Sequence, residues 1–392
     1  MTTVKKAATA GTAKWHELKR RIIEAAPGLG IDKIGFASAE PFAELKERLA
    51  RHREEGRESG FEEPDLEKRV SPRLNFPGGE PRSLLSIAVA YPAKLDSPPK
   101  SEPGAYRGIL SRSAWGEDYH AALRERMRKL EAFIRGEEPE SKIVSMVDTG
   151  ALVDRAVAER AGIGWYGKNC AVITPEFGSW VYLGEMITDL PLPPDMPVTE
   201  SCGDCTICID ACPTGALVGP GELNSSRCIS FVTQTKGFVG DELKRKIGNR
   251  LYGCDTCQIV CPKNKGLNWT HHPEFKPDPE LAKPLLKPIP GLSNKQFKEQ
   301  FGRSAAAWRG KKPIQRNAII ALGNFKDASA VPLLIELLET DERPVIRGTA
   351  AWALGRIGGA EAAGALKRAA ERETDPEASN ELRKAMNGLA LS

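Results

Sequence analysis

The sequence lacks the long apolar runs from which membrane helices are made. No stretch of its 392 residues approaches about 18 consecutive apolar side chains, the length that a bilayer-spanning helix needs. The pair Arg20-Arg21 is followed by a short and polar segment, not by the apolar region of an export signal. We therefore expect a cytoplasmic protein that does not enter a membrane.

A strong excess of charge of either sign is also missing. The chain has 56 basic and 52 acidic residues and a net charge of +4, so it is not a polyanion binder over its whole surface. A local basic surface has to be sought segment by segment. The length predicts two or three domains, and the composition is ordinary for a globular protein.

Cysteine is scarce outside one segment. Eight of the nine cysteines lie between Cys202 and Cys261, and Cys170 stands alone. An odd number of cysteines, clustered in one part of a cytosolic chain, favours metal binding over a disulfide framework. We interpret Cys170 as a small buried residue before a strand.

The cysteine segment contains two runs with ferredoxin spacing. The first run, from Cys202 to Pro213, reads C-x2-C-x2-C-x3-C-P. The second, from Cys254 to Pro262, has the same ending but is one cysteine short, and Cys228 between the runs can replace it. Gaps of two residues let one loop present three thiolates to a single cluster, and the gap of three residues with its proline turns the fourth cysteine toward a second cluster.

These runs predict two [4Fe–4S] clusters with crossed ligand sets. One set consists of Cys202, Cys205, Cys208 and Cys261, and the other consists of Cys212, Cys228, Cys254 and Cys257. The alternative is a pair of structural zinc sites, because C-x2-C pairs also bind zinc. Zinc sites do not require the C-x3-C-P ending, which occurs here twice. Purified protein that contained zinc and no iron would overturn the prediction.

Residues 12–195 alternate helix and strand patterns and predict a mixed α/β domain. The predicted helices are Trp15–Ala25, Tyr119–Arg135 and Ala151–Ala161, the predicted strands are Ser83–Tyr91 and Lys142–Val147, and Val172–Thr174 with Trp180–Thr188 predict a hairpin. Residues 196–270 form the predicted ferredoxin-like domain.

Asp148 is the carboxylate that position singles out. It ends a predicted strand, where a side chain tends to point into a cleft, and a carboxyl group in a cleft can have a raised pKa and donate a proton. The alternative is an ordinary turn or helix-capping aspartate. We expect Thr149 to cap the following helix, and Asp154, beside Arg155, to belong to a surface ion pair.

Two familiar motifs do not fit on inspection. The segment Gly162–Gly167 matches G-x-G-x-x-G, but it follows a helix, whereas a dinucleotide site needs a strand, a loop and a helix in that order. We interpret Gly162 as a glycine that ends a helix. Asp118 and His120 begin like the D-x-H-x-x-G loop of some cobalamin enzymes, but Leu123 replaces the closing glycine, so we do not expect His120 to bind cobalt.

The C-terminal part contains a proline-rich segment and then a repeat. Residues 271–300 carry six prolines between positions 273 and 290 and predict a linker. The sequence Ala-Leu-Gly at 321–323 recurs at 353–355, a shift of 32 residues, and a weaker third copy starts at Leu382. A repeat of this length with helical periodicity predicts a HEAT-like stack over residues 301–392.

A basic run begins this repeat module. Phe301 to Lys326 contains six basic residues and no acidic residue. Such runs are often solvated faces, but this one precedes a scaffold module and includes a tryptophan, which favours contact with a phosphate backbone. The candidate nucleic-acid contacts are Arg303, Trp308, Arg309, Lys311, Lys312, Arg316 and, beside the second cysteine run, Lys236.

In their order along the chain, these motifs resemble one family. The matching segments are Ser111–His120, Val147–Gly150, Asp154–Gly164, Gly167–Asn169, Thr174–Ser179, the two cysteine runs, Arg227–Ser230, Gly248–Cys254 and Pro313–Asn317. The chain resembles the epoxyqueuosine reductases, the cobalamin-dependent enzymes of the last step of queuosine synthesis in tRNA. The resemblance extends over nearly the whole chain.

The resemblance implies an oxidoreductase with base-off cobalamin, reduced through the two clusters and by an external low-potential electron donor. Its substrate would be epoxyqueuosine at the wobble position of a tRNA anticodon, and its product queuosine. The family's proton donor corresponds to Asp148. The residues that the resemblance implies for cobalamin are Ser111, Asp148, Thr174, Ser179, Ser230 and Asp255. The repeats would hold the anticodon stem-loop, and we expect a monomer.

Two other functions stay open at this point. A cobalamin-dependent reductive dehalogenase uses similar clusters, but the missing export signal and the C-terminal repeat do not favour it. A non-enzymatic electron-transfer protein, docked to a partner through its repeats, would leave residues 12–195 without a role.

Overall fold

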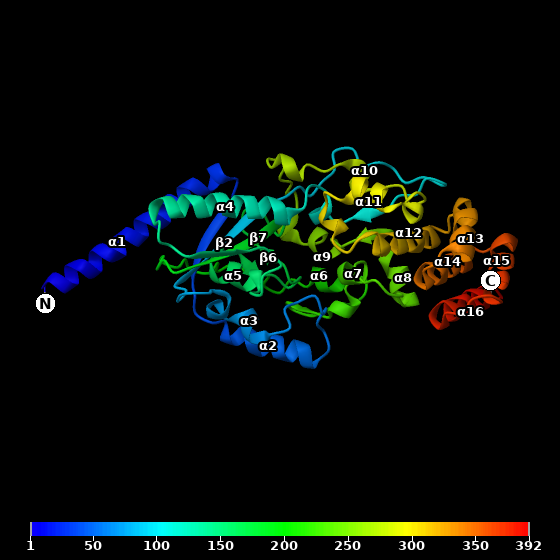
Figure 1. Cartoon of the computed structure of the whole chain (residues 1–392), viewed down its shortest axis with the longest axis horizontal. Coiled ribbons are helices and arrows are strands. Elements are labelled where there is room, and N and C mark those ends of the chain that lie inside the picture. Colours follow the sequence, from blue (N-terminus) through cyan, green and yellow to red (C-terminus); the bar gives the residue numbers. More distant parts are fainter. Residues whose placement is uncertain (1, 391–392) are drawn as a thin grey trace. The chain divides into compact units, whose positions relative to one another are not determined.

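The computed structural model describes residues 2–390, which fold as two compact units (Figure 1). The first unit comprises residues 1–93, 118–226 and 256–275, and the second comprises residues 94–117, 227–255 and 276–392. Within residues 2–390, no helix combines the length and the apolar content that crossing a membrane demands.

A four-stranded antiparallel sheet with the strand order β1-β2-β7-β4 lies at the centre of the first unit. The strands are β1 (Lys33–Ser38), β2 (Ser83–Ala90), β7 (Val181–Thr188) and β4 (Ile143–Met146). Strand β2 is buried along its whole length, because helices cover both faces of the sheet. The register sets Ser86 of β2 opposite Glu185 of β7, and Glu185 opposite Met146 of β4.

The two faces of the sheet carry different helices (Figure 1). Helices α1 (Thr2–Ala25) and α4 (Tyr119–Glu137) pack on one face, and α2 (Ala43–Glu54), α3 (Leu66–Val70) and α5 (Asp154–Arg160) pack on the other. The apolar stripe by which α4 joins the core consists of Leu123, Met127, Leu130 and Ile134. These positions recur at helical spacing, which is why the helix could be predicted.

Most of the predicted elements of this unit are present, but three details differ. Helix α1 begins at Thr2, not at Trp15. Helix α5 begins at Asp154, and Thr149 does not cap it, because the hydroxyl group of Thr149 donates a hydrogen bond to the carbonyl oxygen of Val147. Gly162 follows this helix with a φ of +71°, as expected of a glycine that ends a helix.

The predicted hairpin is wrong. Strand β6 (Val172–Ile173) pairs with β5 (Trp165–Tyr166), whereas β7 enters the main sheet between β2 and β4. The reason is burial: β7 is apolar on both faces and has to be covered on both, which only a central strand allows.

Short elements carry the cysteine segment. In the first unit they are α6 (Ile207–Asp210), β8 (Leu217–Gly219), β9 (Glu222–Leu223) and α9 (Thr256–Ile259). In the second unit they are α7 (Ile229–Val232), α8 (Asp241–Ile247) and β10 (Arg250–Tyr252), which pairs in parallel with β3 (Ile109–Leu110).

The rest of the second unit is helical. The predicted linker is not wholly irregular, since it contains α10 (Pro279–Ala282) and most of α11 (Asn294–Phe301). The repeat module consists of α12 (Lys311–Phe325), α13 (Val331–Thr340), α14 (Pro344–Ile357), α15 (Ala360–Ala370) and α16 (Pro376–Ala390).

The glycines of the repeated Ala-Leu-Gly sequence explain the repeat. A Cβ atom on Gly323 would lie 3.0 Å from Cα of Ala353 on α14, and one on Gly355 would lie 2.9 Å from Cα of Ala385 on α16. Each repeat therefore needs a residue without a side chain where the next long helix crosses it. This confirms a stack of HEAT-like repeats.

Candidate active site and cluster centres

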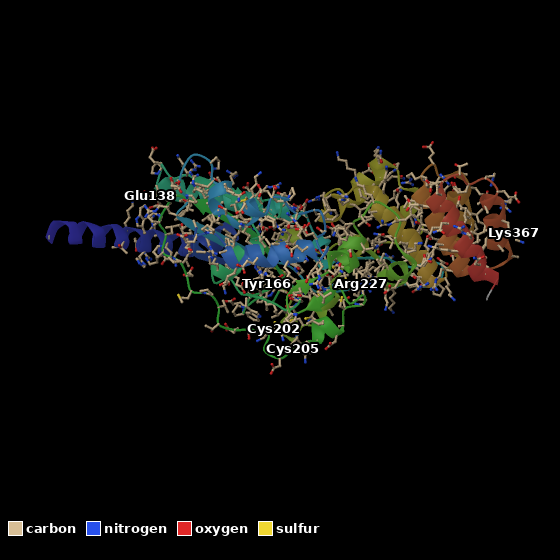
Figure 2. The ribbon with its side chains drawn as sticks, turned by 90° about the horizontal axis from the view of Figure 1, so that it is seen from below. Glu138, Tyr166, Cys202, Cys205, Arg227 and Lys367 are labelled. Atoms are coloured by element: carbon tan, nitrogen blue, oxygen red, sulfur yellow. The ribbon has the colours of Figure 1, made fainter. Side chains whose placement is uncertain are left out.

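Four cysteines from the two ends of the cysteine segment line one small cavity in the first unit. They are Cys202, Cys205, Cys208 and Cys261, the set predicted for one cluster. Figure 2 marks Cys202 and Cys205, which lie on the loop that opens the segment. Burial, and then the neighbouring cysteines, raise the pKa of the Cys208 and Cys261 thiols. Thiols crowded together in an apolar setting are a donor set that suits iron, whose charge stabilises the thiolates.

Two further cysteines of the first unit lie beside this cavity. Cys212 and Cys257 share a small apolar group with Cys170 and Leu217. Burial alone would raise the pKa of the Cys212 thiol, but backbone N–H groups, that of Leu217 first, lower it overall. Cys170 is buried just before β6, as predicted, although its φ of +63° was not foreseen.

The remaining two cysteines, Cys228 and Cys254, belong to the second unit. Cys228 stands immediately before α7, and Cys254 follows β10.

Asp148 lies on the loop between β4 and α5 in an unusual conformation. Its φ of +52° is rare for residues other than glycine, although aspartate tolerates it better than most. The backbone N–H of Asp148 donates a hydrogen bond to Oδ2 of Asp154 at 3.0 Å. The side chain is 62% exposed, and its Oδ2 accepts a hydrogen bond from the hydroxyl group of Tyr119 at 2.8 Å. The loop thus presents one carboxyl group to solvent and holds it from two sides.

His120 is the second neighbour of this carboxyl group. Its Nε2 lies 3.5 Å from Oδ2 of Asp148, and its Nδ1 lies 2.7 Å from Oδ1 of Asp118. Asp118 is the N-cap of α4 and also accepts the backbone N–H of His120. The bond to Asp118 first, and that to Asp148 second, raise the pKa of His120 to about 9, so the ring is an imidazolium at neutral pH.

A row of stacked rings fixes the start of α4. His120 stacks on Tyr119 at 4.1 Å between ring centres, Tyr119 stacks on Tyr182 at 4.6 Å, and Tyr182 stacks on Tyr91 at 4.3 Å. Tyr182 is on β7 and Tyr91 directly follows β2. The groups that face Asp148 are therefore anchored to the central sheet.

A buried pair of carboxyl groups lies behind the Asp148 loop. Glu185 on β7 is fully buried, and within the described part of the chain no N–H or O–H group reaches either of its oxygens. The carboxyl group of Asp154 lies near enough to share a hydrogen bond with it. Two carboxylates cannot bond each other without a proton, so the pair holds one.

The pKa values place this proton on Glu185. Burial, and then the charge of Asp154, raise the pKa of Glu185 well above its usual value. Burial first, and then Asp148, raise the pKa of Asp154 to about 6. Asp154 is thus the ionised partner and accepts the N–H of Asp148. The expected surface ion pair of Asp154 is wrong, because its carboxyl group faces Glu185 and accepts the N–H of Asp148.

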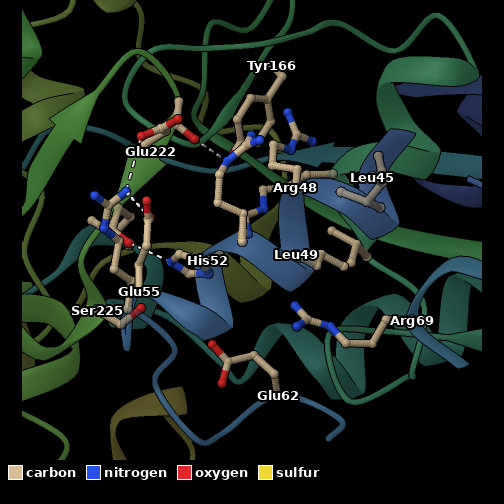
Figure 3. Close-up of a pocket in the computed structure, with 17 residues that line it drawn as sticks. Leu45, Arg48, Leu49, His52, Glu55, Glu62, Arg69, Tyr166, Glu222 and Ser225 are labelled. Atoms are coloured by element: carbon tan, nitrogen blue, oxygen red, sulfur yellow. Dashed lines mark hydrogen bonds and ion pairs between the residues drawn. The ribbon is translucent and has the colours of Figure 1, made fainter. Parts of the chain in front are cut away.

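A cavity lies on the other side of α5, against α2 (Figure 3). Its lining includes Arg48, Tyr166 and Arg155, and both guanidinium groups lie over the Tyr166 ring, at 5.1 and 5.5 Å. Arg155 also donates a hydrogen bond to the carbonyl oxygen of Cys170 at 2.6 Å. Arg155 therefore connects this cavity to the backbone of Cys170, whose side chain packs with Cys212 and Cys257.

The candidate cobalamin residues are mostly engaged within the protein. In the first unit, Ser179 Oγ accepts hydrogen bonds from Asn264 at 2.8 Å and Gln258 at 3.1 Å, and Thr174 Oγ1 donates to Gly178. Three other candidate cobalamin residues, Ser111, Ser230 and Asp255, belong to the second unit. Asp255 is buried and accepts the backbone N–H and Nη1 of Arg112, and Ser111 Oγ bonds Ser113 Oγ. These residues shape the backbone around them.

The candidate nucleic-acid contacts, all in the second unit, differ in exposure. Arg303 is 82% exposed, and Lys236 and Lys312 are exposed as well. Trp308 is half exposed, and its Nε1 donates a hydrogen bond to Gln234. Arg309 and Lys311 are partly buried and donate hydrogen bonds to the carbonyl oxygens of Gln234 and Leu292, respectively.

Arg316 is a correction to the predicted surface. It is 1% exposed, and its guanidinium donates hydrogen bonds to the carbonyl oxygens of Val232 at 2.9 Å and Gly237 at 2.6 Å. This arginine holds α12 to the segment after α7 and offers no surface to a phosphate.

Comparison with known proteins decides the family. A model described as "Epoxyqueuosine reductase QueG, DUF1730" matches residues 69–149, a 4Fe-4S double cluster binding domain matches residues 201–264, and HEAT repeats match residues 306–387. An epoxyqueuosine reductase of Bacillus cereus is 57% identical over 376 residues, which are 96% of this chain and 98% of the relative. The chain belongs to the epoxyqueuosine reductase family.

Other members of the epoxyqueuosine reductase family are similarly close to this chain. The Bacillus subtilis relative is 57% identical over 96% of this chain and 97% of its own length. A crystal structure of an epoxyqueuosine reductase with an epoxyqueuosine-modified tRNA stem loop superposes with a TM-score of 0.93 at 57% identity, covering 96% of this chain and all of that one. A structure of the Bacillus subtilis epoxyqueuosine reductase, in which a catalytic loop that carries an aspartate is swung out of the active site, superposes with a TM-score of 0.93 at 56% identity, covering 96% of this chain and all of that one.

Sequence reasoning missed several groups that this epoxyqueuosine reductase fold brings to Asp148. It did not single out Tyr119 or Glu185, and it considered His120 only as a cobalt ligand. A signal existed for Glu185, because a charged residue stood inside an otherwise apolar strand. No comparable signal marked Tyr119, whose position depends on how α4 packs on the sheet.

Proposed function

We propose that the protein reduces the epoxide of epoxyqueuosine in tRNA to queuosine and releases the epoxide oxygen as water. The observation that carries this proposal is the Asp148 site, where one exposed carboxyl group is held between Tyr119 and His120 in a chain that belongs to the epoxyqueuosine reductases. The relative that is bound to an epoxyqueuosine-modified stem loop supports the same substrate here. Family membership favours this function over a dehalogenase or an electron carrier.

Three cofactors would carry the electrons that an external donor supplies. One [4Fe–4S] cluster would be held by the four cysteines of the cavity, and the other by the set Cys212, Cys228, Cys254 and Cys257. Clusters transfer single electrons, whereas opening an epoxide to an alkene takes two, and cobalamin supplies the two-electron chemistry at carbon. An external low-potential donor would reduce the clusters.

Four of the five histidines of the first unit are engaged within the protein, and the fifth, His16, is exposed on α1. His52, His120, His271 and His272 each use a ring nitrogen in a hydrogen bond to the protein. His120, the one beside Asp148, uses Nδ1 for Asp118 and turns Nε2 to Asp148. The residues that would shape the cobalamin site are Ser111, Asp148, Thr174, Ser179, Ser230 and Asp255.

Asp148 would give the proton that the epoxide oxygen needs as its C–O bond opens. It lies on the loop between β4 and α5 with its side chain exposed, and a movement of this loop would change the position of the carboxyl group. The relative whose catalytic loop is swung out of the active site supports such movement.

Different segments of the chain would carry different parts of the function. We assign corrin binding and catalysis to residues 12–195, the clusters to residues 196–270, a connection to residues 271–300 and tRNA binding to residues 301–392. The tRNA contacts would be Lys236, Arg303, Trp308, Arg309, Lys311 and Lys312, without Arg316. A tRNA substrate supports a cytoplasmic location for the protein.

An anaerobic turnover tests the function. Cluster-loaded protein, cobalamin, a strong reductant and tRNA carrying epoxyqueuosine would be mixed, and the nucleosides would then be digested and weighed. We expect the mass of one oxygen to be lost only when cobalamin is present. Unchanged nucleosides, with clusters and cobalamin shown to be bound, would refute the proposal, and halide release from an organohalide would favour the dehalogenase.

A further inference from the structure

A proton donor should hold a proton at neutral pH, but Asp148 does not. The hydrogen bond with His120 is the largest influence on this carboxyl group, and together with that of Tyr119 it lowers the pKa of Asp148 below its usual value. The carboxyl group is therefore ionised in the resting protein. A proton that leaves from Asp148 has to reach it from a neighbour.

His120 is the neighbour that carries one. Its two ring nitrogens face two carboxylates, Asp118 at 2.7 Å on its own helix and Asp148 at 3.5 Å on the loop after β4. Two cations oppose these charges less directly, since Arg124 acts on Asp118 and Arg155 acts on Asp148. With two carboxylates in contact, the imidazolium form is favoured, and its pKa rises to about 9.

Tyr119 is a less suitable source. Its hydroxyl group also donates to Oδ2 of Asp148, at 2.8 Å. A phenol that gives up its proton becomes an anion beside the Asp148 carboxylate, whereas an imidazolium that gives up its proton becomes a neutral ring. The geometry therefore assigns positioning to Tyr119 and leaves the transferable proton on His120.

We propose that His120 stores the proton that Asp148 delivers to the epoxide oxygen, and that Asp118 keeps His120 charged between turnovers. This inference rests on the proposed function and extends it. His120 acts through Asp148 and does not touch the substrate, so it is a positioning residue. Its role is to hold the proton beside Asp148 until Asp148 accepts it. Transfer needs only that Nε2 and Oδ2 close from 3.5 Å to ordinary hydrogen-bonding distance, which rotation about the side-chain bonds of Asp148 permits.

The stoichiometry of the reaction makes such a store useful. One epoxide, two electrons and two protons give one alkene and one water: both C–O bonds break, the carbons are reduced, and the oxygen leaves with both protons. The clusters deliver the electrons from the external donor. A single carboxyl group can deliver one proton, and it must be recharged before it delivers the second. His120 recharges it and regains its own proton from solvent.

Rate measurements over a range of pH test this role. In single-turnover deoxygenation with the loaded full-length enzyme, we expect the wild-type rate to fall as the pH rises through about 9, where His120 loses its proton. His120→Gln should lose this pH dependence and be slower by about a hundredfold at neutral pH. Asp118→Asn should keep His120 but move the fall to a lower pH. His16→Gln, on an exposed histidine of α1, is the matched control and should behave as the wild type.

A titration separates this inference from the function itself. The ring signals of selectively labelled histidines in the full-length, cluster-loaded protein would be followed by nuclear magnetic resonance, and His120→Gln identifies the signal that belongs to His120. A midpoint near 9 that falls in Asp118→Asn supports the proposal even if no tRNA is turned over, in which case only the proposed function fails. A midpoint in the ordinary histidine range, or an unchanged rate profile in His120→Gln, overturns it.

Discussion

The active-site loop shows at the scale of single residues how much depends on neighbours from distant parts of the chain. Asp148 could be chosen from the sequence, because it ends a strand in a segment that resembles the family's proton-donor motif. Its partner Tyr119 lies 29 residues away and meets it only because α4 packs beside β4. The sequence therefore indicated the acid but not the groups that set its charge, and the φ of +52° was not predictable from a motif.

The first prediction concerns Asp148 itself. Asparagine also tolerates a positive φ and keeps the shape of the side chain, so Asp148→Asn removes the acid without disturbing the loop. We expect single-turnover deoxygenation to slow by about a hundredfold or more, the usual contribution of a general acid. The absorption spectrum of bound cobalamin should not change. Full turnover in this variant would exclude Asp148 as the proton donor.

The second prediction concerns the buried proton of Glu185. Because the folded-state pKa is raised, the native state keeps its proton where the unfolded chain has lost it, so stability falls as the pH rises above the unfolded value of 4.5. Glu185→Gln cannot ionise and escapes this loss. Relative to the variant, the wild type should lose up to about 1.4 kcal/mol per pH unit between about pH 5 and pH 7.

Denaturant unfolding at several pH values measures this difference. Glutamine can still donate a hydrogen bond to Asp154, so Glu185→Gln should retain the anchor of the Asp148 loop. Asp154→Asn is the contrasting variant, since it weakens the acceptor of the Asp148 N–H and should impair turnover. If the unfolding free energy of the wild type and that of Glu185→Gln changed with pH in parallel, Glu185 would not be protonated in the folded protein.

At the scale of elements, the sequence predicted which helices and strands exist better than it predicted which strands pair. The strands predicted at Ser83–Tyr91 and Lys142–Val147 are present as β2 and β4, and the helix predicted at Tyr119–Arg135 is present as α4. The supposed hairpin failed because nearness in sequence was taken for pairing, whereas β7 needs cover on both faces and pairs with β2 and β4. The later start of α5 had a larger consequence. Asp154, which was expected at the surface, is the first residue of α5 and contacts Glu185.

The third prediction uses the glycines of the repeat module. Gly323→Ala on α12 would bring Cβ to 2.8 Å from the Trp352 ring and 3.0 Å from the backbone of Ala353, in a core that cannot yield freely. We expect a loss of about 1–3 kcal/mol in unfolding free energy. Gly364→Ala on α15 meets only the end of the Arg368 side chain at 3.5 Å and should gain about 0.5–1 kcal/mol. Equal effects of the two changes in denaturant unfolding would contradict the packing argument.

At the scale of the whole molecule, bulk charge was the least informative property. A net charge of +4 gave no indication of an RNA substrate, and the local basic run gave one only in part. Arg316 belongs to that run by sequence, yet the fold uses it internally, because α12 is buried along most of its length. Sequence position marks where basic residues are dense, and only burial separates those that can meet phosphate from those that hold helices.

The last prediction follows from this separation. Arg303 and Lys312 are exposed, and if each contacts a phosphate, its replacement by alanine should lower the slope of log affinity for the tRNA stem-loop against log salt by about one. Lys367→Ala, an exposed lysine of α15 outside the proposed surface, is the control of equal charge and should leave the slope unchanged.

Arg316→Met should give the opposite pattern, and the contrast is the test. It removes a buried charge that bonds two carbonyl oxygens, so the second unit should lose about 3 kcal/mol or more of stability. Protein that remains folded should keep the wild-type salt slope, because no phosphate contact has been lost. If Arg316→Met lowered the slope while Arg303→Ala did not, the tRNA would have to reach a surface that this conformation buries, and the repeat module would have to open to bind it.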